Sequence, residues 1–383
     1  MRGRHLSLVL LVPTVLAIGT AQASSIDQSP RRFASFSSPY VLPTAVGSIG
    51  TLDLPSSPDN WLGGTGNWSN GADWSSGLPG SNDDVSINTG NDNVTLDTSS
   101  SINSLTLGGT GGSSRLTGDG NAHTLTIAGA LTINQSGNLY LSDDTMTAGA
   151  SSTNLGTASL EFGSSLQING DVNNSATLNM GQGLSSSNNS LNVTGTLTNT
   201  GTVNIGHFSF TSIGGGTATV GGLSNSGTIN LGGESTLQVN GNATNSGVVS
   251  LDVSTALSVT GNLINSGTLE ILSDDNGIAG QVSIVGTLTN TSTGLVMVGG
   301  DVARATVGTL VNQGAIGIDA GFASSAVFAI AGDATNSGSI GFGSEGTNHL
   351  TVGGALTNNA GATLALRIFP EQLPSEAWPT PEP

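Results

Sequence analysis

Adjacent carboxylates are the residues of this sequence that come nearest to a catalytic pattern. The pairs are Asp83/Asp84, Asp143/Asp144 and Asp274/Asp275. Glycoside hydrolysis needs two carboxyl groups that face each other across a bond, about 5 to 9.5 Å apart. Neighbours in a strand point to opposite faces, and Ser, Asn or Gly borders each pair, so we interpret them as solvated corners. The sequence therefore predicts no catalytic residue and a protein that is not an enzyme.

Metal ligation finds little support in the histidines and acidic residues. His123, His207 and His349 are each isolated and match neither HxH nor HExxH, so we expect surface positions beside strands. Carboxylate oxygens suit calcium, but no loop matches an EF-hand or a glycine-rich nonapeptide repeat. The acidic corners considered for calcium are Asp83, Asp84, Asp92, Asp274 and Asp275. We assign no metal site and expect no cofactor.

Three tryptophans lie close together near the start of the repetitive part of the chain. Trp61, Trp68 and Trp74 belong to a Trp- and Gly-rich segment, residues 59–84. Tryptophan rings can stack on sugar rings, which makes these three the candidate ligand-binding residues. The favoured interpretation is a lid over the apolar end of a repeat structure, because an open end would expose core and unpaired strand edges.

Charge and composition exclude several classes of protein. The chain of 383 residues has no cysteine, seven basic residues that are all arginine, and 25 acidic residues, for a net charge of -18. Without cysteine there is no disulfide scaffold, thiolate metal site or cysteine nucleophile. Without clustered cations, nucleic acids and anionic membranes are unsuitable partners.

A repeated unit with strand periodicity must position all of these residues. In residues 190–206, SLNVTGTLTNTGTVNIG, and 256–272, ALSVTGNLINSGTLEIL, the apolar residues and one asparagine share the same offsets. The gaps between them are 2, 4, 2, 4 and 2, all even, which places the set on one face of successive strands. The intervening Asn, Thr, Ser and Gln residues then form a polar, neutral outer face. That outer face varies from coil to coil, which argues against a regular array for binding ice or a crystal.

One asparagine marks each unit and shares the inward face with the leucines. The row is Asn174, Asn199, Asn225, Asn245, Asn265, Asn290, Asn312, Asn336 and Asn358. The spacing is 20 to 26 residues and averages 23, enough for one coil of about three short strands. We expect stacked amides to hydrogen bond along the axis, and the left-handed conformation that asparagine tolerates to form the corner. A glycine two residues after most markers is a second corner residue.

The predicted fold is all-β, a parallel β-solenoid of about 12 coils and on the order of 60 Å long. The predicted divisions are a signal peptide 1–23, a Ser/Pro-rich linker 24–58, the Trp/Gly-rich cap 59–84, the solenoid 85–367 and a Pro-rich acidic tail 368–383. The signal peptide rests on Arg2 and Arg4, an apolar run 6–19 and the small residues before Ser24. We therefore expect a secreted or cell-surface protein with no transmembrane helix in the mature chain.

The Trp/Gly-rich segment followed by coils such as LNVTGTLTNTGTVNIG resembles bacterial β-strand-repeat surface proteins. These are the autotransporter-passenger-like and PEP-CTERM-associated proteins, and Pro381–Pro383 is similar to the start of a PEP-CTERM sorting signal. The resemblance implies an exported right-handed β-helix on the bacterial outer surface, associated with adhesion or extracellular matrix. We expect a non-enzymatic, adhesin-like protein whose partners are extracellular polysaccharide or cell surfaces. The alternative is a carbohydrate-binding or polysaccharide-degrading β-helix.

Overall fold

The computed structural model describes residues 56–366 apart from 110, 184–187, 207–214, 273–279, 301, 320–324 and 344–345. The expected signal peptide 1–23, the linker up to residue 55 and the tail 368–383 lie outside the described residues. The chain divides into two units, and all described residues belong to the unit Leu54–Pro383.

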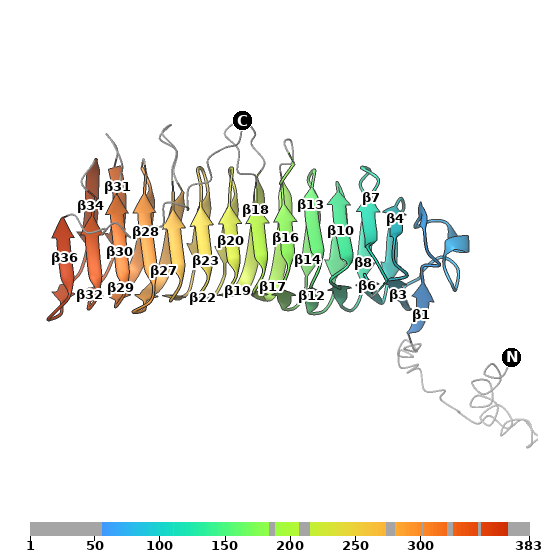
Figure 1. Ribbon diagram of the computed structural model, residues 1–383, viewed down its shortest axis with the longest axis horizontal. Coiled ribbons are helices and arrows are strands. Elements are labelled where there is room, and N and C mark those ends of the chain that lie inside the picture. Colours follow the sequence, from blue (N-terminus) through green and yellow to red (C-terminus); the bar gives the residue numbers. More distant parts are fainter. Residues whose placement is uncertain are drawn as a thin grey trace, which may run out of the picture. The chain divides into compact units, whose positions relative to one another are not determined.

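The described unit is a parallel β-solenoid, as the repeat predicts (Figure 1). Two sheets form its walls, and strands of successive turns pair in parallel. We call the 22-stranded sheet the wide sheet, because most turns contribute two strands or one long bent strand to it, and the 14-stranded sheet the narrow sheet. The only helical segment among the described residues is the short 3-10 turn η2, Gly71–Asp73.

The wide sheet contains these strands: β1 Ser57–Asn60, β3 Asp83–Ile87, β5 Ser100–Ile102, β6 Ser104–Leu107, β8 Thr124–Ile127, β9 Leu131–Ile133, β11 Thr145–Ala148, β12 Ser152–Asn154, β14 Ser165–Ile168, β15 Val172–Asn174, β17 Asn189–Asn199, β19 Gly216–Asn225, β21 Thr236–Val239, β22 Ala243–Asn245, β24 Ala256–Val259, β25 Leu263–Asn265, β27 Gln281–Asn290, β29 Arg304–Asn312, β31 Ser325–Ile330, β32 Ala334–Asn336, β34 Thr347–Val352 and β35 Leu356–Asn358.

The narrow sheet contains these strands: β2 Thr65–Asn67, β4 Asp92–Leu96, β7 Ser114–Gly118, β10 Gly137–Ser142, β13 Thr157–Glu161, β16 Thr177–Met180, β18 Thr202–Ile205, β20 Thr228–Leu231, β23 Val248–Leu251, β26 Thr268–Ile271, β28 Leu295–Gly299, β30 Ala315–Asp319, β33 Ser339–Phe342 and β36 Thr363–Leu366.

The number of turns is close to the 12 expected from the sequence. The 14 strands of the narrow sheet are separated by 13 steps, about 62 Å at the ordinary interstrand spacing. One additional turn comes from the Trp-rich segment, since β1 pairs with β3 and β2 pairs with β4. The expected cap is thus built into the first turn, and the expected linker contributes Ser57 and Pro58 to β1.

The core is the column of side chains between the two sheets. In the turn made by β17 and β18, the inward residues Leu191, Val193, Leu197, Val203 and Ile205 are all buried. This is the set that the even gaps place on one face, and the same parity holds from turn to turn because the register is kept. The interior is a single continuous apolar core from Trp61 to Ile340.

Close approach of the backbone at the corners explains the repeated glycines. A Cβ on Gly247 would lie 2.6 Å from the carbonyl carbon of Ser226 in the preceding turn, a separation that real Cβ atoms essentially never show. Gly227 and Gly267 meet the preceding turn in the same way. These glycines do not have positive φ, so their role is to give room to the neighbouring turn and not to adopt a left-handed conformation.

Candidate functional site

The predicted asparagine row forms a hydrogen-bonded ladder inside the solenoid. Each Nδ2 donates to the Oδ1 of the asparagine one turn further on, with distances from 2.7 to 2.9 Å between Asn174 and Asn358. Each Nδ2 from Asn174 to Asn336 also donates to a main-chain carbonyl of the next turn, as Asn245 does to Thr268 at 2.9 Å. All nine lie at the same register position, and all but Asn358 are buried. The row therefore satisfies its polar atoms within an apolar core.

The ladder begins one turn earlier than the sequence indicated. Asn154 donates to Asn174 Oδ1 at 2.7 Å and is itself buried. It was missed because its unit is a weaker copy of the repeat, although TNLG at 153–156 has the Asn and Gly at the usual spacing. In the first turns the same position is apolar, with Ile87, Leu107 and Ile133 in register with Asn154.

The expected left-handed conformation of the marker asparagines is wrong. None of the nine has a positive φ; each ends a strand in extended conformation. The side chain, and not the backbone, holds the corner: Asn199 Nδ2 donates to the carbonyl of Gly201 at 3.2 Å, two residues further on. The asparagine thus replaces a turn hydrogen bond at the corner while it links successive turns.

The three candidate sugar-stacking tryptophans are buried at the N-terminal end of the solenoid. Trp61, Trp68 and Trp74 are 1%, 0% and 3% exposed. Trp74 packs edge-on against both other rings, with centroids 5.0 Å from Trp61 and 4.9 Å from Trp68. Because packing of a sugar requires an open ring face, this arrangement does not fit sugar stacking and fits the covering of the apolar end.

Asp59 occupies the same end of the core. It lies in register with Val85, an inward core residue, and is fully buried. Its Oδ1 accepts from the Ser75 hydroxyl at 3.0 Å and from the Ser76 amide at 2.8 Å, whereas its Oδ2 and Trp68 Nε1 are buried without a hydrogen-bond partner. Asp59 therefore ties the chain after the tryptophans to β1.

The interpretation of Asp83 and Asp84 as a solvated corner is wrong. Both lie in β3 and are half-buried. Asp83 accepts from the Ser57 hydroxyl at 2.6 Å, while Asp84 accepts from the Ser104 hydroxyl at 2.6 Å and from Asn103 Nδ2 at 2.7 Å. Hydrogen bonds, that from Ser104 first, lower the pKa of Asp84. The two carboxylates therefore join adjacent turns and have separate partners.

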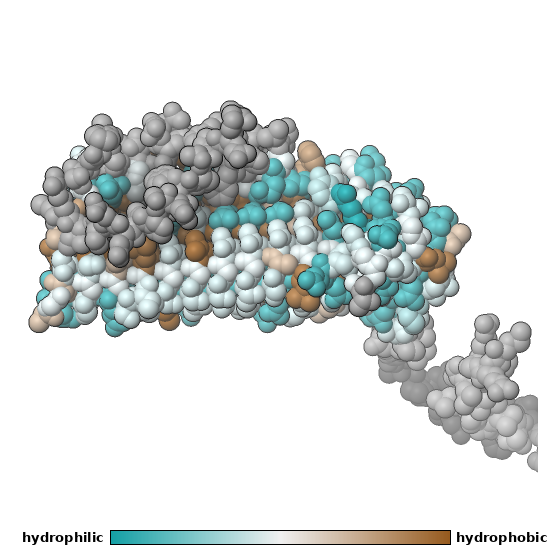
Figure 2. Space-filling model, in the orientation of Figure 1, coloured by the Kyte–Doolittle hydropathy of each residue, from teal (hydrophilic) through white to brown (hydrophobic). Residues whose placement is uncertain are grey.

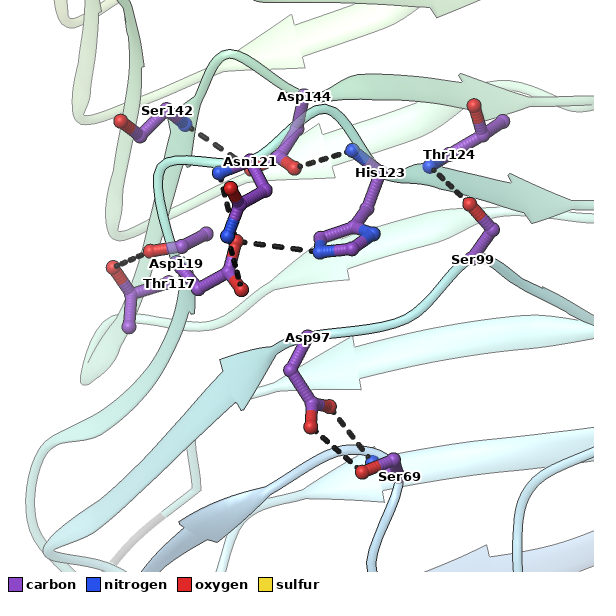
Figure 3. A network of polar contacts seen from close by, with 11 residues as sticks. Ser69, Asp97, Ser99, Thr117, Asp119, Asn121, His123, Thr124, Ser142 and Asp144 are labelled. Atoms are coloured by element: carbon purple, nitrogen blue, oxygen red, sulfur yellow. Dashed lines mark hydrogen bonds and ion pairs between the residues drawn. The ribbon is translucent and has the colours of Figure 1, made fainter.

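Asp143 and Asp144 differ from each other, so only part of their interpretation holds. Asp143 is exposed at a corner with φ 63°, whereas Asp144 is buried. Asp144 accepts from the main-chain amides of His123 and Ser142, each at 3.2 Å (Figure 3). Burial raises the pKa of Asp144, partly offset by these hydrogen bonds. The carboxylate organises the corner from inside the protein.

His123 lies in the same group of polar residues and is not a simple surface residue. Its Nε2 is 3.3 Å from Asp119 Oδ1, and its side chain is 18% exposed (Figure 3). Asp119 is engaged chiefly by Asn121, whose amide donates at 2.8 Å and whose Nδ2 donates at 2.9 Å, and the pKa of Asp119 is lowered. His349 lies in β34, on the outer side of the wide sheet.

His207, Asp274 and Asp275 lie outside the described residues. Among the residues that the structure does describe, no three His, Asp or Glu side chains come together as a group that could hold a metal ion. Asp92, one of the acids considered for calcium, is buried and accepts from the Ser114 hydroxyl at 2.8 Å and from the Gly90 amide at 3.1 Å.

Acidic residues collect along one edge of the solenoid, at the corner between a narrow-sheet strand and the wide-sheet strand that follows it. Described residues at this corner are Asp97, Asp119, Asp143, Asp144, Glu234 and Asp252. Asp97 at the first of these corners accepts from the amide and hydroxyl of Ser69, at 2.9 and 2.6 Å (Figure 3). Much of the negative charge is thereby kept off the flat faces of the sheets.

The outer face of the wide sheet is an extended surface formed mainly by hydroxyl and amide side chains, in which Ile264 of β25 and Val285 of β27 are exposed apolar exceptions. Every strand of this sheet from β8 to β27 lacks a charged residue. One outward row continues through eight turns in unbroken register and consists of Thr126, Thr147, Gln167, Asn192, Thr219, Gln238, Ser258 and Ser283. We call the outward residues of β8 to β27 the hydroxyl–amide face. In Figure 2 the lower edge of the solenoid, where Figure 1 labels β12, β17, β19 and β22, is largely white, the colour of intermediate hydropathy.

Neighbouring side chains partly hold this face in place. Gln167 Nε2 donates to Asn169 Oδ1 at 2.8 Å, and Gln238 repeats the contact with Asn240 at 2.8 Å. The Ser190 hydroxyl donates to that of Ser165 at 2.8 Å between turns. Side chains that are already ordered lose less conformational entropy when a partner binds.

Comparison with known proteins gave no match: no protein-family model, no curated protein and no solved structure is similar to this chain at a significant level. The described part of the chain contains no helix with the length and apolar character needed to cross a membrane.

Proposed function

We propose that this protein is an exported, non-enzymatic surface or extracellular-matrix protein that adheres to neutral polysaccharide through the hydroxyl–amide face. The observation that carries the proposal is the uncharged face itself, which extends from β8 to β27 on a chain of net charge -18. Hydroxyl and amide groups both donate and accept hydrogen bonds, which is what a polymer of hydroxyl groups requires. Repetition over many turns supplies many weak contacts along one ligand.

The charge distribution supports a neutral partner over an anionic one. The acidic corner borders this face, and an excess of negative charge disfavours the approach of anionic polymers. Since the contacts are between uncharged groups, binding should change little with ionic strength. Export is supported by the basic, apolar and small-residue segments of residues 1–23.

A pull-down with insoluble cellulose, compared with soluble polygalacturonate, tests the proposed adhesion. The triple variant Asn192→Glu, Thr219→Glu, Gln238→Glu places three charges in one row of the hydroxyl–amide face. It should weaken binding to cellulose by at least about tenfold, because several polar contacts of about 1 kcal/mol each are lost.

The matched control places the same three charges on the narrow sheet. Thr177, Thr202 and Thr228 are also consecutive in one outward row, so their replacement by Glu brings equal charge at equal spacing. Binding by this control should equal that of the unmodified protein, with circular dichroism to show that both variants fold. Equal loss in both triples, or preference for polygalacturonate, would contradict the assignment of the face.

Export is tested separately by N-terminal sequencing. Expression of the full chain in a bacterium should yield an extracytoplasmic protein that begins at Ser24, and a chain without residues 1–23 should remain in the cytoplasm. Recovery of the full chain with Met1 from the cytoplasm would refute export.

A further inference from the structure

The two ends of the solenoid differ in how their strand edges are finished. At the N-terminal end, β1 pairs in parallel only with β3, and residues 73–75 lie against its other edge, where the Ser75 amide donates to the Asn60 carbonyl at 2.9 Å. The amides of Ser57 and Trp61 donate to the second turn, so alternation directs the nitrogens of Pro58 and Asn60 to this other edge. Pro58 has no N–H, and the Asn60 amide donates to the Ser75 hydroxyl at 2.9 Å. This edge therefore offers no donor to a further strand, and tryptophans cover its core.

The C-terminal end lacks these features among the described residues. Inward residues of the last turn are not buried: Leu356 and Leu364 are 41% and 44% exposed, although their counterparts in the preceding turn, Ala334 and Ile340, are buried. We call the outer side of β34, β35 and β36 the terminal face.

The strand edges at the terminal face carry hydrogen-bond donors. The amides of Gly353 and Thr363 donate to the preceding turn, so alternation directs the N–H groups of Val352 and Leu364 away from it. An open edge beside exposed leucines is a template for strand addition and aggregation. The terminal face is thus a docking surface for an apolar, extended segment.

We propose that residues 367–383 of the same chain bind across the terminal face and close this end. The segment follows directly from Leu366, the last residue of β36, so it starts at the surface that it covers. Extended chain reaches about 3.3 Å per residue, so even the part up to Trp378 can span roughly 35 to 40 Å, which is more than the roughly 20 Å length of β34, the longest strand of the last turn.

The chemistry of the segment matches both features of the terminal face. It carries four large apolar side chains, Ile368, Phe369, Leu373 and Trp378, and two of them, Phe369 and Leu373, share one face of an extended segment and can cover the exposed core together. It also carries prolines, and Pro370 and Pro374 lie four residues apart, so they share one edge of an extended segment. Prolines on the outer edge remove donors, as Pro58 does at the opposite end of the solenoid.

A second copy of the chain is the competing occupant, and concentration argues against it. Attachment to β36 gives the segment an effective concentration of about millimolar, whereas a second copy must associate from dilute solution. The N-terminal end is covered by tryptophans and has no free donor on β1, which leaves only the three-residue strand β2 with an open edge for head-to-tail stacking.

Hydrogen exchange measured by mass spectrometry on the full chain tests the proposal. The double variant Phe369→Asp, Leu373→Asp should accelerate exchange in residues 347–366 by about tenfold or more, because it removes two large apolar side chains from the interface. Peptides from residues 57–74 at the other end should be unchanged. The matched control Gln372→Asp, Thr380→Asp adds the same charge to the opposite face of the same segment and should exchange as the unmodified chain does.

Two results would overturn the proposal. The first is equal, rapid exchange of residues 347–366 in the unmodified chain and in both variants, which would mean that the segment leaves the end open. The second is protection that rises with protein concentration together with a dimer in light scattering, which would assign the terminal face to a second copy.

Discussion

Removal of one asparagine from the middle of the ladder should destabilise the protein far more than removal of the last one. Asn245 accepts from Asn225 at 2.8 Å and donates to Asn265 at 2.8 Å and to the Thr268 carbonyl at 2.9 Å. Asn245→Ala deletes all three contacts and leaves Asn265 Oδ1 buried without this donor, while Asn225 keeps its main-chain carbonyl partners.

The magnitude follows from the atoms left without partners. An orphaned buried acceptor costs about 1 to 3 kcal/mol, and each further lost hydrogen bond about 1 kcal/mol, so the variant should lose about 2 to 4 kcal/mol of unfolding free energy. Asn358→Ala is the matched control. Its side chain is exposed, and Asn336 Nδ2 retains its bond to the Thr363 carbonyl at 3.0 Å, so the loss should stay below about 1 kcal/mol.

Urea unfolding followed by far-ultraviolet circular dichroism measures both variants. The midpoints should differ while the slopes agree, since both chains expose the same surface on unfolding. Equal midpoints for Asn245→Ala and Asn358→Ala would refute the view that the buried amide ladder stabilises the core.

Four further substitutions have outcomes that the structure specifies. Gly247→Ala should lower the unfolding midpoint strongly, because its Cβ would collide with the preceding turn, whereas Gly299→Ala, whose Cβ would meet its nearest neighbour at 3.7 Å, should change it little. Burial raises the pKa of Glu270 above its ordinary value of 4.5, so the folded protein binds a proton on this carboxyl more tightly than the unfolded chain does. The free energy of unfolding therefore falls as the pH rises from 4.5 through the pKa of the folded state. Glu270→Gln should therefore be more stable than the unmodified protein at neutral pH, with the gain shrinking in acid below 4.5; a gain that does not depend on pH would contradict this reasoning. The pKa of Asp84 is shifted in the opposite direction, because hydrogen bonds lower it below 3.8. Asp84→Asn should therefore be less stable than the unmodified protein at neutral pH, and the difference in unfolding free energy should disappear as the pH falls below 3.8.

Periodicity by itself determined the fold and the inner row of asparagines. A strand alternates its side chains with a period of two, so even gaps assign Leu191 or Asn199 to the inside without knowledge of any neighbour. A fixed marker in every unit then requires the units to stack, which brings the markers into register. The same reasoning predicted a polar, neutral outer face, and β8 to β27 have it apart from the exposed apolar residues Ile264 and Val285.

Only the tertiary structure decided the features that depend on which turn lies beside which. Asp144 and Asp84 looked like solvated corners because their partners, His123 and Ser104, are about one turn away in sequence. No local sequence pattern shows whether Trp68 is open to a sugar or buried in the core. The packing of the chain around it decides this, and Trp68 is buried. Likewise, the corner glycines are needed for contact between turns and not for their own φ, a distinction that appears only once the neighbouring backbone is in place.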